Sequence, residues 1–377
     1  MVYVFGCGSH LYESVKQSLN KHSIAFDDIP YEFYENGELS FQHFNIDNKS
    51  RRNDKTARSA GPGRTGILLQ LLYKNASECL LSTLFLADLL NIKTVCIPYI
   101  PYSRNKHLFD IFLKKLNTEV VTFDLHFFNA VSMLYEKVTN VPLRRVFRGE
   151  IKGDWDKAFV LAPDKGAIKR ATEFAEDNGL PVFSASKERG GGGAGGSGDS
   201  CNVYLPPIDT SIFTRCFIVD DMIYSGKTIL TTITGLNKIG ISDISIFVTH
   251  VLPESQTLYR ETFLEILRKA STFVTTNIHD VADMYSRPVA KASNFEGFLG
   301  AHEAQNRSVL NVREDSSIGA TLKLQKERSF RNRSNSSAQQ CVELEGGNIW
   351  QGLQPPTIID VTNILVGIIQ KNVTTQP

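Results

Sequence analysis

The fold is decided by one stretch of the chain, Cys216-Phe-Ile-Val-Asp-Asp-Met-Ile-Tyr-Ser-Gly-Lys-Thr-Ile-Leu230. Its apolar beginning, residues 216–219, predicts a strand that is buried on both faces, and residues 228–236 predict a helix. A buried strand that leads into a helix through a short turn is typical of open α/β sheets, which bind ligands at the carboxyl ends of their strands. We therefore expect Asp220 and Asp221 at a ligand-binding edge of a sheet.

The turn after this strand has the composition of a phosphate-binding loop. The backbone N–H groups of residues 224–228 lie at the beginning of the predicted helix, where an anion is favoured. Ser225 and Thr228 add hydroxyl donors, next to Gly226 and Lys227. Carboxylates suit the hydroxyl groups of a sugar and the loop suits a phosphate, so the stretch indicates a ribose phosphate. The alternative without a ligand is an acidic turn that only caps a helix.

Predicted strands alternate with predicted helices along the chain, which favours parallel α/β layers over a sandwich or a bundle. One sheet is expected from residues 2–5, 67–70, 94–97 and 119–122, and a second from residues 159–162, 181–184, 216–219 and 244–249. We place a domain boundary near residue 150, with domains over 1–150 and 151–357. The last segment, 358–377, is expected to contain a helix over 358–370 that packs back onto the first domain.

Composition indicates a soluble enzyme. The chain has 377 residues, 42% of them hydrophobic, and a net charge of +1. This near-neutral charge does not favour nucleic acid or a membrane surface as a partner. Its apolar runs are shorter than the roughly eighteen residues of a membrane span, and its first residues lack the pattern of a signal peptide. The 6 cysteines are scattered without metal-like spacing, which favours a reducing compartment. We expect a cytoplasmic protein.

Three segments do not fit a compact domain and are interpreted as surface insertions. Residues 47–64 are basic and polar, residues 190–200 are almost entirely Gly and Ser, and residues 325–340 are rich in Arg, Ser and Asn. The glycine-rich segment has the composition of a flexible coil. The basic charge of the other two leaves a polyanionic partner as an alternative to a solvated loop.

Four further segments occur in a recognisable order. They are Tyr34-Glu-Asn-Gly-Glu38, Ile97-Pro-Tyr-Ile-Pro-Tyr-Ser-Arg-Asn-Lys-His107, Phe123-Asp-Leu-His126 and Val160-Leu-Ala-Pro-Asp-Lys-Gly-Ala-Ile-Lys-Arg-Ala171. Together with the stretch at 216–230, this set resembles the ribose-phosphate pyrophosphokinase family, also called phosphoribosyl pyrophosphate synthetases. The resemblance covers roughly residues 1–290 and the extreme C-terminus. Each motif alone is weak, whereas the ordered set is specific.

The resemblance implies a fold and an activity. The fold would be α/β, with two phosphoribosyltransferase-like domains, each a mainly parallel sheet flanked by helices, and an active site between them. The enzyme would be a ribose-phosphate diphosphokinase, which transfers the diphosphoryl group of Mg-ATP to the anomeric hydroxyl of ribose 5-phosphate and releases AMP, for nucleotide biosynthesis. The implied partners are ATP, ribose 5-phosphate, Mg²⁺ and further copies of the chain, as a dimer or hexamer.

The resemblance also implies roles for individual residues. ATP would be bound by Tyr34, Asn36, Glu38, Arg104 and Asn105, and the adenine contact would come from a neighbouring subunit. Mg²⁺ would be held by His126 and Asp164, although Mg²⁺ generally prefers oxygen ligands. Lys187 and Arg189 precede the glycine-rich segment and would neutralise charge on the transferring phosphates. Ribose 5-phosphate would be bound by Asp220, Asp221, Ser225, Gly226, Lys227 and Thr228.

Three positions depart from the pattern of that family. Tyr224 stands where an Asp is usual, Lys227 where a Gly is usual, and Lys106 where an acid is common. The resulting Ser-Gly-Lys-Thr loop resembles that of purine phosphoribosyltransferases, so a transferase that consumes the diphosphate stays open. A catalytically weak regulatory paralogue, and a diphosphokinase for a larger ribose 5-phosphate ester, are further alternatives. We favour the synthetase because Arg104, the Asp-Leu-His segment and the Lys187/Arg189 pair have no natural place in a transferase.

Overall fold

A computed structural model of the chain describes residues 1–6, 10–34, 39–40, 66–71, 76–126, 136–147, 155–189, 201–252, 257–279, 281 and 356–374. The chain divides into two compact units, and all described residues belong to the first, Met1–Met284 with Gly352–Pro377. The predicted insertions at 47–64, 190–200 and 325–340 lie outside the described residues. Among the described helices none is long and apolar enough to cross a membrane.

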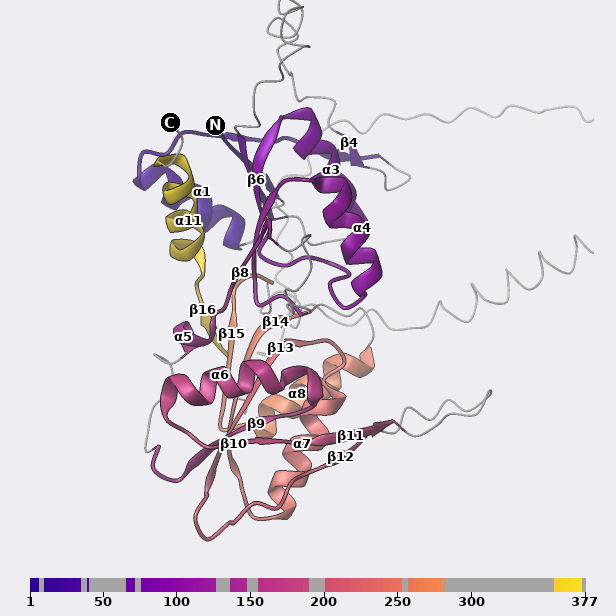
Figure 1. Cartoon of the computed structure of the whole chain (residues 1–377), viewed down its shortest axis with the longest axis vertical. Coiled ribbons are helices and arrows are strands. Elements are labelled where there is room, and N and C mark those ends of the chain that lie inside the picture. Colours follow the sequence, from indigo (N-terminus) through magenta and orange to yellow (C-terminus); the bar gives the residue numbers. More distant parts are fainter. Residues whose placement is uncertain are drawn as a thin grey trace, which may run out of the picture. The chain divides into compact units, whose positions relative to one another are not determined.

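The first sheet has six strands, in the order β2-β1-β5-β6-β7-β8 (Figure 1). These strands are β1 (Val2–Gly6), β2 (Phe26–Asp28), β5 (Gly66–Leu71), β6 (Ile92–Cys96), β7 (Glu119–Phe123) and β8 (Val138–Val141). Every pairing between them is parallel. The helices between them are α1 (His10–Lys21), α3 (Ala76–Leu89) and α4 (Lys106–Leu116). β5 is buried along its whole length, as expected for a strand covered on both faces.

The second sheet repeats this plan, in the order β10-β9-β13-β14-β15-β16. Its strands are β9 (Ala158–Ala162), β10 (Val182–Ser184), β13 (Arg215–Ile223), β14 (Asp243–Val251), β15 (Thr272–Thr276) and β16 (Thr357–Ile359). Its pairings are also parallel. The helices are α6 (Ile168–Asn178), α7 (Lys227–Lys238) and α8 (Thr257–Lys269). Two parallel sheets flanked by helices confirm the predicted α/β class.

Two short antiparallel pairs stand apart from the sheets. β3 (Glu32–Phe33) pairs with β4 (Leu39–Ser40), and β11 (Ser186–Arg189) pairs with β12 (Cys201–Tyr204). The second pair flanks the glycine-rich segment of the sequence and carries Lys187. A predicted catalytic residue therefore lies on a two-stranded hairpin rather than on either main sheet.

The end of the chain joins both halves. β16 pairs with β15 in the second sheet, and the following helix, α11 (Thr362–Thr374), packs against α1 beside the first sheet. The helix predicted over 358–370 begins later than expected, because Thr357–Ile359 is β-branched and pairs as a strand. The Asp360 carboxylate accepts hydrogen bonds from the backbone N–H and the hydroxyl of Thr362, which caps the helix at its observed beginning.

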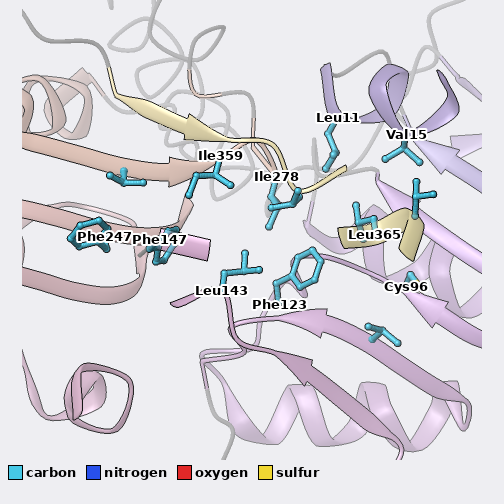
Figure 2. Close-up of a cluster of buried hydrophobic side chains, with 14 of the residues drawn as sticks. Leu11, Val15, Cys96, Phe123, Leu143, Phe147, Phe247, Ile278, Ile359 and Leu365 are labelled. Carbon is cyan, nitrogen blue, oxygen red and sulfur yellow. The ribbon is translucent and has the colours of Figure 1, made fainter. Parts of the chain in front are cut away.

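One hydrophobic cluster runs from α1 and α11 through to the second sheet. It contains Leu11, Phe123, Phe147, Phe247 and Leu365 (Figure 2). Phe147, from the segment that follows β8, packs against Phe247 of β14 with a ring-centroid separation of 5.8 Å. The apolar interior therefore holds the carboxyl end of β7 close to that of β14.

β13 is longer than the sequence predicts. Residues 216–219 were expected to form the strand, with Asp220 and Asp221 at its carboxyl end, but β13 continues to Ile223. Asp220 pairs with Val248, and the pairing with β14 resumes at Met222. The predicted end of the strand was wrong because a local sequence pattern does not show pairing with a distant strand. Pairing with β14 keeps the polar residues 220 and 221 within β13. The acid pair consequently has the fixed backbone of a sheet.

Candidate functional site

A cavity of about 360 Å³ opens at the carboxyl ends of strands from both sheets. The predicted site residues that line it are Arg104, His126, Asp164, Lys187, Asp220, Asp221, Ser225, Gly226 and Thr228. They come from segments far apart in the sequence. The cavity therefore brings together the predicted acid pair, the phosphate loop and the cations.

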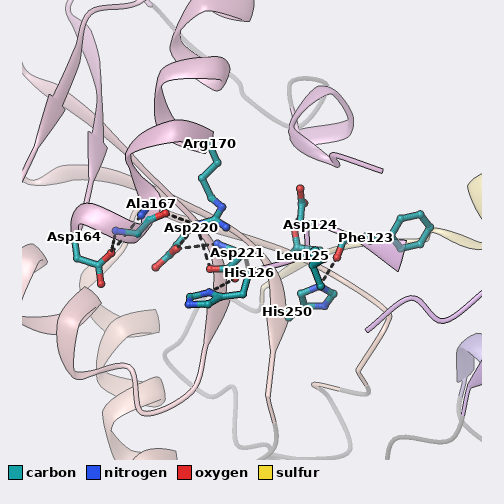
Figure 3. A network of polar contacts seen from close by, with 12 residues as sticks. Phe123, Asp124, Leu125, His126, Asp164, Ala167, Arg170, Asp220, Asp221 and His250 are labelled. Carbon is teal, nitrogen blue, oxygen red and sulfur yellow. Dashed lines mark hydrogen bonds and ion pairs between the residues drawn. The ribbon is translucent and has the colours of Figure 1, made fainter. Parts of the chain in front are cut away.

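The two neighbouring acids differ in their surroundings. The side chain of Asp221 is 1% exposed and that of Asp220 is 16% exposed. Asp221 Oδ2 lies 2.7 Å from His126 Nδ1, and its Oδ1 lies 3.4 Å from Arg170 Nη1. The same guanidinium nitrogen lies 3.4 Å from Asp220 Oδ1 (Figure 3). Asp221 is therefore held on both oxygens, whereas Asp220 is the acid nearer to the solvent.

Electrostatics separate the two acids further. Burial raises the pKa of Asp220 well above its ordinary value, and the charge of Asp221 adds to this effect. Burial also acts on Asp221, but the hydrogen bond from His126 and the charge of Arg170 hold the pKa of Asp221 below its ordinary value. Opposite shifts of adjacent carboxyls are typical of coupled pairs. The inner acid is thus a fixed anion and the outer one takes up protons more readily.

His126 is placed by a series of contacts between β7 and the second sheet. His250 Nε2 donates a hydrogen bond of 3.0 Å to the carbonyl oxygen of Phe123. Asp124, which has a left-handed backbone (φ 39°), accepts hydrogen bonds from Leu143 N at 3.2 Å and from the Thr249 hydroxyl. The third contact is that of His126 with Asp221. The segment 123–126 is therefore fixed to β14 through Phe123 and Asp124 and to β13 through His126.

Arg170 is a site residue that the sequence interpretation did not identify. It lies on α6, its side chain is 18% exposed, and it lies close to both Asp220 and Asp221. Burial lowers its pKa, but the charges of Asp221 and Asp220 outweigh that and raise it. The signal was present in the segment 160–171, where this arginine follows Asp164 and lies on the next helix, α6. Only the fold shows that it meets the acid pair of β13.

Asp164 begins a short helical turn, η3 (Lys165–Ala167). Its Oδ1 accepts hydrogen bonds from Gly166 N at 2.9 Å and Ala167 N at 3.3 Å. These bonds fix the carboxylate at the edge of the cavity and use one of its two oxygens. The predicted role of Asp164 as an oxygen ligand for Mg²⁺ fits this arrangement.

His126 also fits the predicted metal site. A carboxylate that accepts the Nδ1 proton of a histidine leaves the lone pair on Nε2, the arrangement seen around metal-binding histidines. Within the described residues no three side chains of His, Cys, Asp or Glu are grouped as a metal site. A metal held by His126 and Asp164 would therefore need oxygens from substrates or water, as Mg²⁺ commonly does.

The phosphate loop is shaped by a glycine and a lysine contact. Gly226 has φ 72°, and a Cβ there would lie 2.9 Å from Ile266 Cδ1, so another residue is both strained and obstructed. Lys187 Nζ donates a hydrogen bond of 2.9 Å to Thr228 Oγ1. A predicted catalytic cation thus reaches the predicted phosphate site. Arg189 lies on the same strand, but its side chain is outside the described residues.

Arg104 reaches the cavity from the first sheet, beyond the end of β6. Its guanidinium carbon lies 5.3 Å from the ring centroid of Tyr224. Asn105, in contrast, caps α4, because its Oδ1 accepts a hydrogen bond of 3.2 Å from Leu108 N. The structure does not bring Asn105 to the cavity lining, and its predicted role in binding ATP remains a prediction.

The remaining predicted residues lie elsewhere. Tyr34 follows β3, is 45% exposed and does not line the cavity. Asn36 and Glu38 are outside the described residues. Lys227 begins α7 next to the cavity but is not among its lining residues. The predicted adenine contact, which would come from a neighbouring subunit, stays a prediction.

Comparison with known proteins gives three kinds of match. The phosphoribosyl transferase domain family matches residues 143–278. A ribose-phosphate pyrophosphokinase of Pyrococcus abyssi (strain GE5 / Orsay) is 27% identical over 215 residues, which are 52% of this chain and 72% of that protein. One from Thermococcus kodakarensis is 27% identical over 214 residues, 52% of this chain and 74% of that protein.

A solved structure agrees in fold. Phosphoribosylpyrophosphate synthetase from Mycobacterium smegmatis superposes with a TM-score of 0.55 at 20% identity, over 81% of this chain and 99% of the other. These matches confirm the resemblance that the motifs indicated, and the predicted enzyme class is that of the named relatives.

Proposed function

Because this chain is a relative of the ribose-phosphate pyrophosphokinases, we propose that it transfers the diphosphoryl group of ATP to ribose 5-phosphate. One observation carries the proposal: the acid pair, the phosphate loop and the cations Arg104 and Lys187 line a single cavity. Transfer from a polyphosphate to a sugar phosphate requires carboxylates for the sugar hydroxyls and anion-binding groups for the phosphates in one cavity.

The reaction is a displacement at phosphorus. The anomeric oxygen of ribose 5-phosphate forms a bond to the β-phosphorus of ATP, the bond from that phosphorus to the bridging oxygen of the α-phosphate breaks, and AMP leaves. The hydroxyl proton passes to solvent. Such a transfer asks the protein mainly for positioning and for stabilisation of charge.

The acceptor is held by the second sheet. Asp220 and Asp221 bind the ribose hydroxyls, with Asp220 in direct contact because it is the more exposed acid. The backbone of residues 225–228 and the hydroxyls of Ser225 and Thr228 bind the 5-phosphate. Lys227 adds a positive charge at the first residue of α7. The buried Asp221 keeps the acid pair and His126 in register.

The donor is held by cations and metal ligands. Arg104, Lys187 and Arg189 neutralise the phosphates of ATP, and the contact of Lys187 with Thr228 keeps its amine beside the acceptor loop. Mg²⁺ bound at His126 and Asp164 would withdraw charge from the transferring phosphates. The adenine is bound by Tyr34, Asn36 and Glu38 of a neighbouring subunit, so the active form is a homo-oligomer. Its proposed location is the cytoplasm.

The test is a product assay. Protein incubated with ATP, Mg²⁺ and ribose 5-phosphate is expected to form AMP and phosphoribosyl diphosphate in equal amounts. The variant Asp220→Asn is expected to bind ribose 5-phosphate more weakly, seen as a higher KM for this substrate. Nucleotide formed from a base and the diphosphate would instead indicate the transferase. AMP formed only with a larger ribose 5-phosphate ester would indicate an altered acceptor. No product in any of the three assays would favour the regulatory paralogue and contradict the proposal.

A further inference from the structure

Tyr224 and Arg104 meet across the cavity from different sheets. Tyr224 follows β13 in the phosphate loop, whereas Arg104 follows β6. Both side chains line the cavity, and the guanidinium lies over the tyrosine ring at 5.3 Å. A cation within about 6 Å of a ring centroid is attracted to the face of that ring. This contact links the acceptor loop to the cation on the opposite side.

The type of contact matters for what Arg104 can still bind. A guanidinium that stacks on a ring uses its flat face, while its five N–H donors lie in the plane. In that arrangement the ring does not take up the N–H donors that phosphate oxygens would need. A carboxylate at position 224 would instead pair with the edge of the guanidinium and occupy two donors. Tyr224 therefore holds Arg104 without competing for its phosphate-binding edge.

The tyrosine itself stands on a fixed backbone. Ile223 pairs with Val251 of β14, and its carbonyl oxygen accepts a hydrogen bond of 2.9 Å from Leu252 N. On the other side, Gly226 has its left-handed conformation against Ile266 of α8. The ring is thus attached to the loop that is expected to bind the 5-phosphate. Any ordering of that loop also orders the surface on which Arg104 rests.

We propose that Tyr224 is a positioning residue that holds Arg104 for the phosphates of ATP and couples the ATP site to the acceptor loop. The proposal rests on the proposed function and deepens it. When ribose 5-phosphate binds to the phosphate loop, it orders the Tyr224 ring. The ordered ring holds Arg104 in place and so strengthens the binding of ATP. Because coupling between two binding sites is reciprocal, ATP strengthens the binding of ribose 5-phosphate by the same factor.

The test compares Tyr224→Leu, Tyr224→Phe, Arg104→Ala and the double variant Tyr224→Leu/Arg104→Ala, with Phe85→Leu as an exposed aromatic control outside the cavity. Calorimetry measures ATP binding with and without ribose 5-phosphate, and AMP formation gives KM and kcat. Tyr224→Leu is expected to weaken ATP binding about threefold, the scale of an exposed cation–π contact. It should also reduce the effect of ribose 5-phosphate on that binding. Tyr224→Phe keeps the aromatic ring and should retain both the ATP affinity and the effect of ribose 5-phosphate on it. The control Phe85→Leu should match the wild type in both measurements.

The double variant decides the mechanism. If Tyr224 acts through Arg104, Tyr224→Leu has no further effect on ATP binding once Arg104 is Ala. An equal loss in both backgrounds, or unchanged ATP affinity in Tyr224→Leu, overturns the proposal. Failure of the proposed function looks different, because the wild type then forms no AMP while the binding cycle still reports on Tyr224 and Arg104. Thermal unfolding of each variant shows whether the fold is retained.

Discussion

The two walls of the cavity are built in different ways. One wall is fixed: Asp221 of the second sheet is almost completely buried between Arg170 and His126, which follows β7 of the first sheet, and Gly226 fits against α8. The other wall presents Arg104, an exposed cation on a loop beyond β6 that rests on the Tyr224 ring. A buried charge is tolerated only with fixed partners, whereas an exposed one adapts. The proposed acceptor side is therefore preorganised, and we expect the proposed donor side to adjust to its ligand.

The strongest way to break the fixed wall is to remove Arg170. In Arg170→Met, the carboxylates of Asp220 and Asp221 lose their shared cation, and breaking a buried pair in this way costs about 3–5 kcal/mol. We expect the free energy of unfolding to fall by that amount in urea titrations at pH 7. Arg170→Lys keeps the charge and should lose less. Equal stability of Arg170→Met and the wild type would mean that the acids do not depend on this arginine.

Acid should weaken the fixed wall through His250. Burial lowers the pKa of His250 to about 4, so between about pH 6.5 and pH 4 the unfolded chain binds a proton that the folded chain does not. Stability is fully present above pH 6.5 and falls as the pH decreases, by about 3 kcal/mol for this group. Urea unfolding between pH 8 and pH 4 measures the slope. His250→Gln keeps a donor for the Phe123 carbonyl but cannot titrate, and an unchanged slope in this variant would contradict the assignment.

Lys187 tests a cation that comes from neither main sheet, since it lies on the β11–β12 hairpin and reaches the loop through Thr228. Lys187→Ala is expected to lower kcat at least about a hundredfold, the scale of one lost preorganised charge contact. AMP formation with saturating ATP and ribose 5-phosphate measures this. Lys115→Ala, an exposed lysine on α4, serves as the matched control. A rate in Lys187→Ala close to that of the control would remove Lys187 from the mechanism.

A smaller change sharpens the comparison at the junction of the sheets. Thr249→Val removes the hydroxyl that donates to Asp124 while keeping the shape of the side chain. Loss of a hydrogen bond to this partly buried carboxylate is expected to cost about 1–3 kcal/mol, measured as a lower midpoint in thermal unfolding. Thr231→Val is a suitable control, because its hydroxyl bonds only within α7. A similar loss of stability in both variants would mean that the Thr249–Asp124 hydrogen bond contributes no more than a hydrogen bond within a helix, and that it does not specifically join the two sheets.

Sequence reasoning located the ligand edge because its signals are local. An apolar run followed by two acids, a glycine and hydroxyls describes a strand end and an anion site without further information. It did not find that β13 continues to Ile223, since strand length there depends on pairing with β14. The role of Arg170 was hidden for the same reason: on α6 it reads as an ordinary helix residue. Contacts between distant segments carry no local pattern.

Other differences had signals that were open to a second interpretation. Asn105 stands directly before a helical pattern, which is a typical capping position, yet the resemblance drew attention to ATP binding instead. The pairing of His126 with Asp221 joins residues that are 95 positions apart. A motif shows that both residues matter, but only the fold shows that they bind each other. The predicted roles at Asn36, Glu38 and Arg189 remain predictions.

The helix α11 gives this chain an order of assembly. It covers the apolar surface of α1, although it follows β16, which pairs within the second sheet. Domains usually fold during synthesis from the amino end onward. Because α1 precedes α11 in the chain, its apolar face waits for α11, and a chain truncated before α11 leaves Leu11 and Val15 without this cover and exposes them to aggregation.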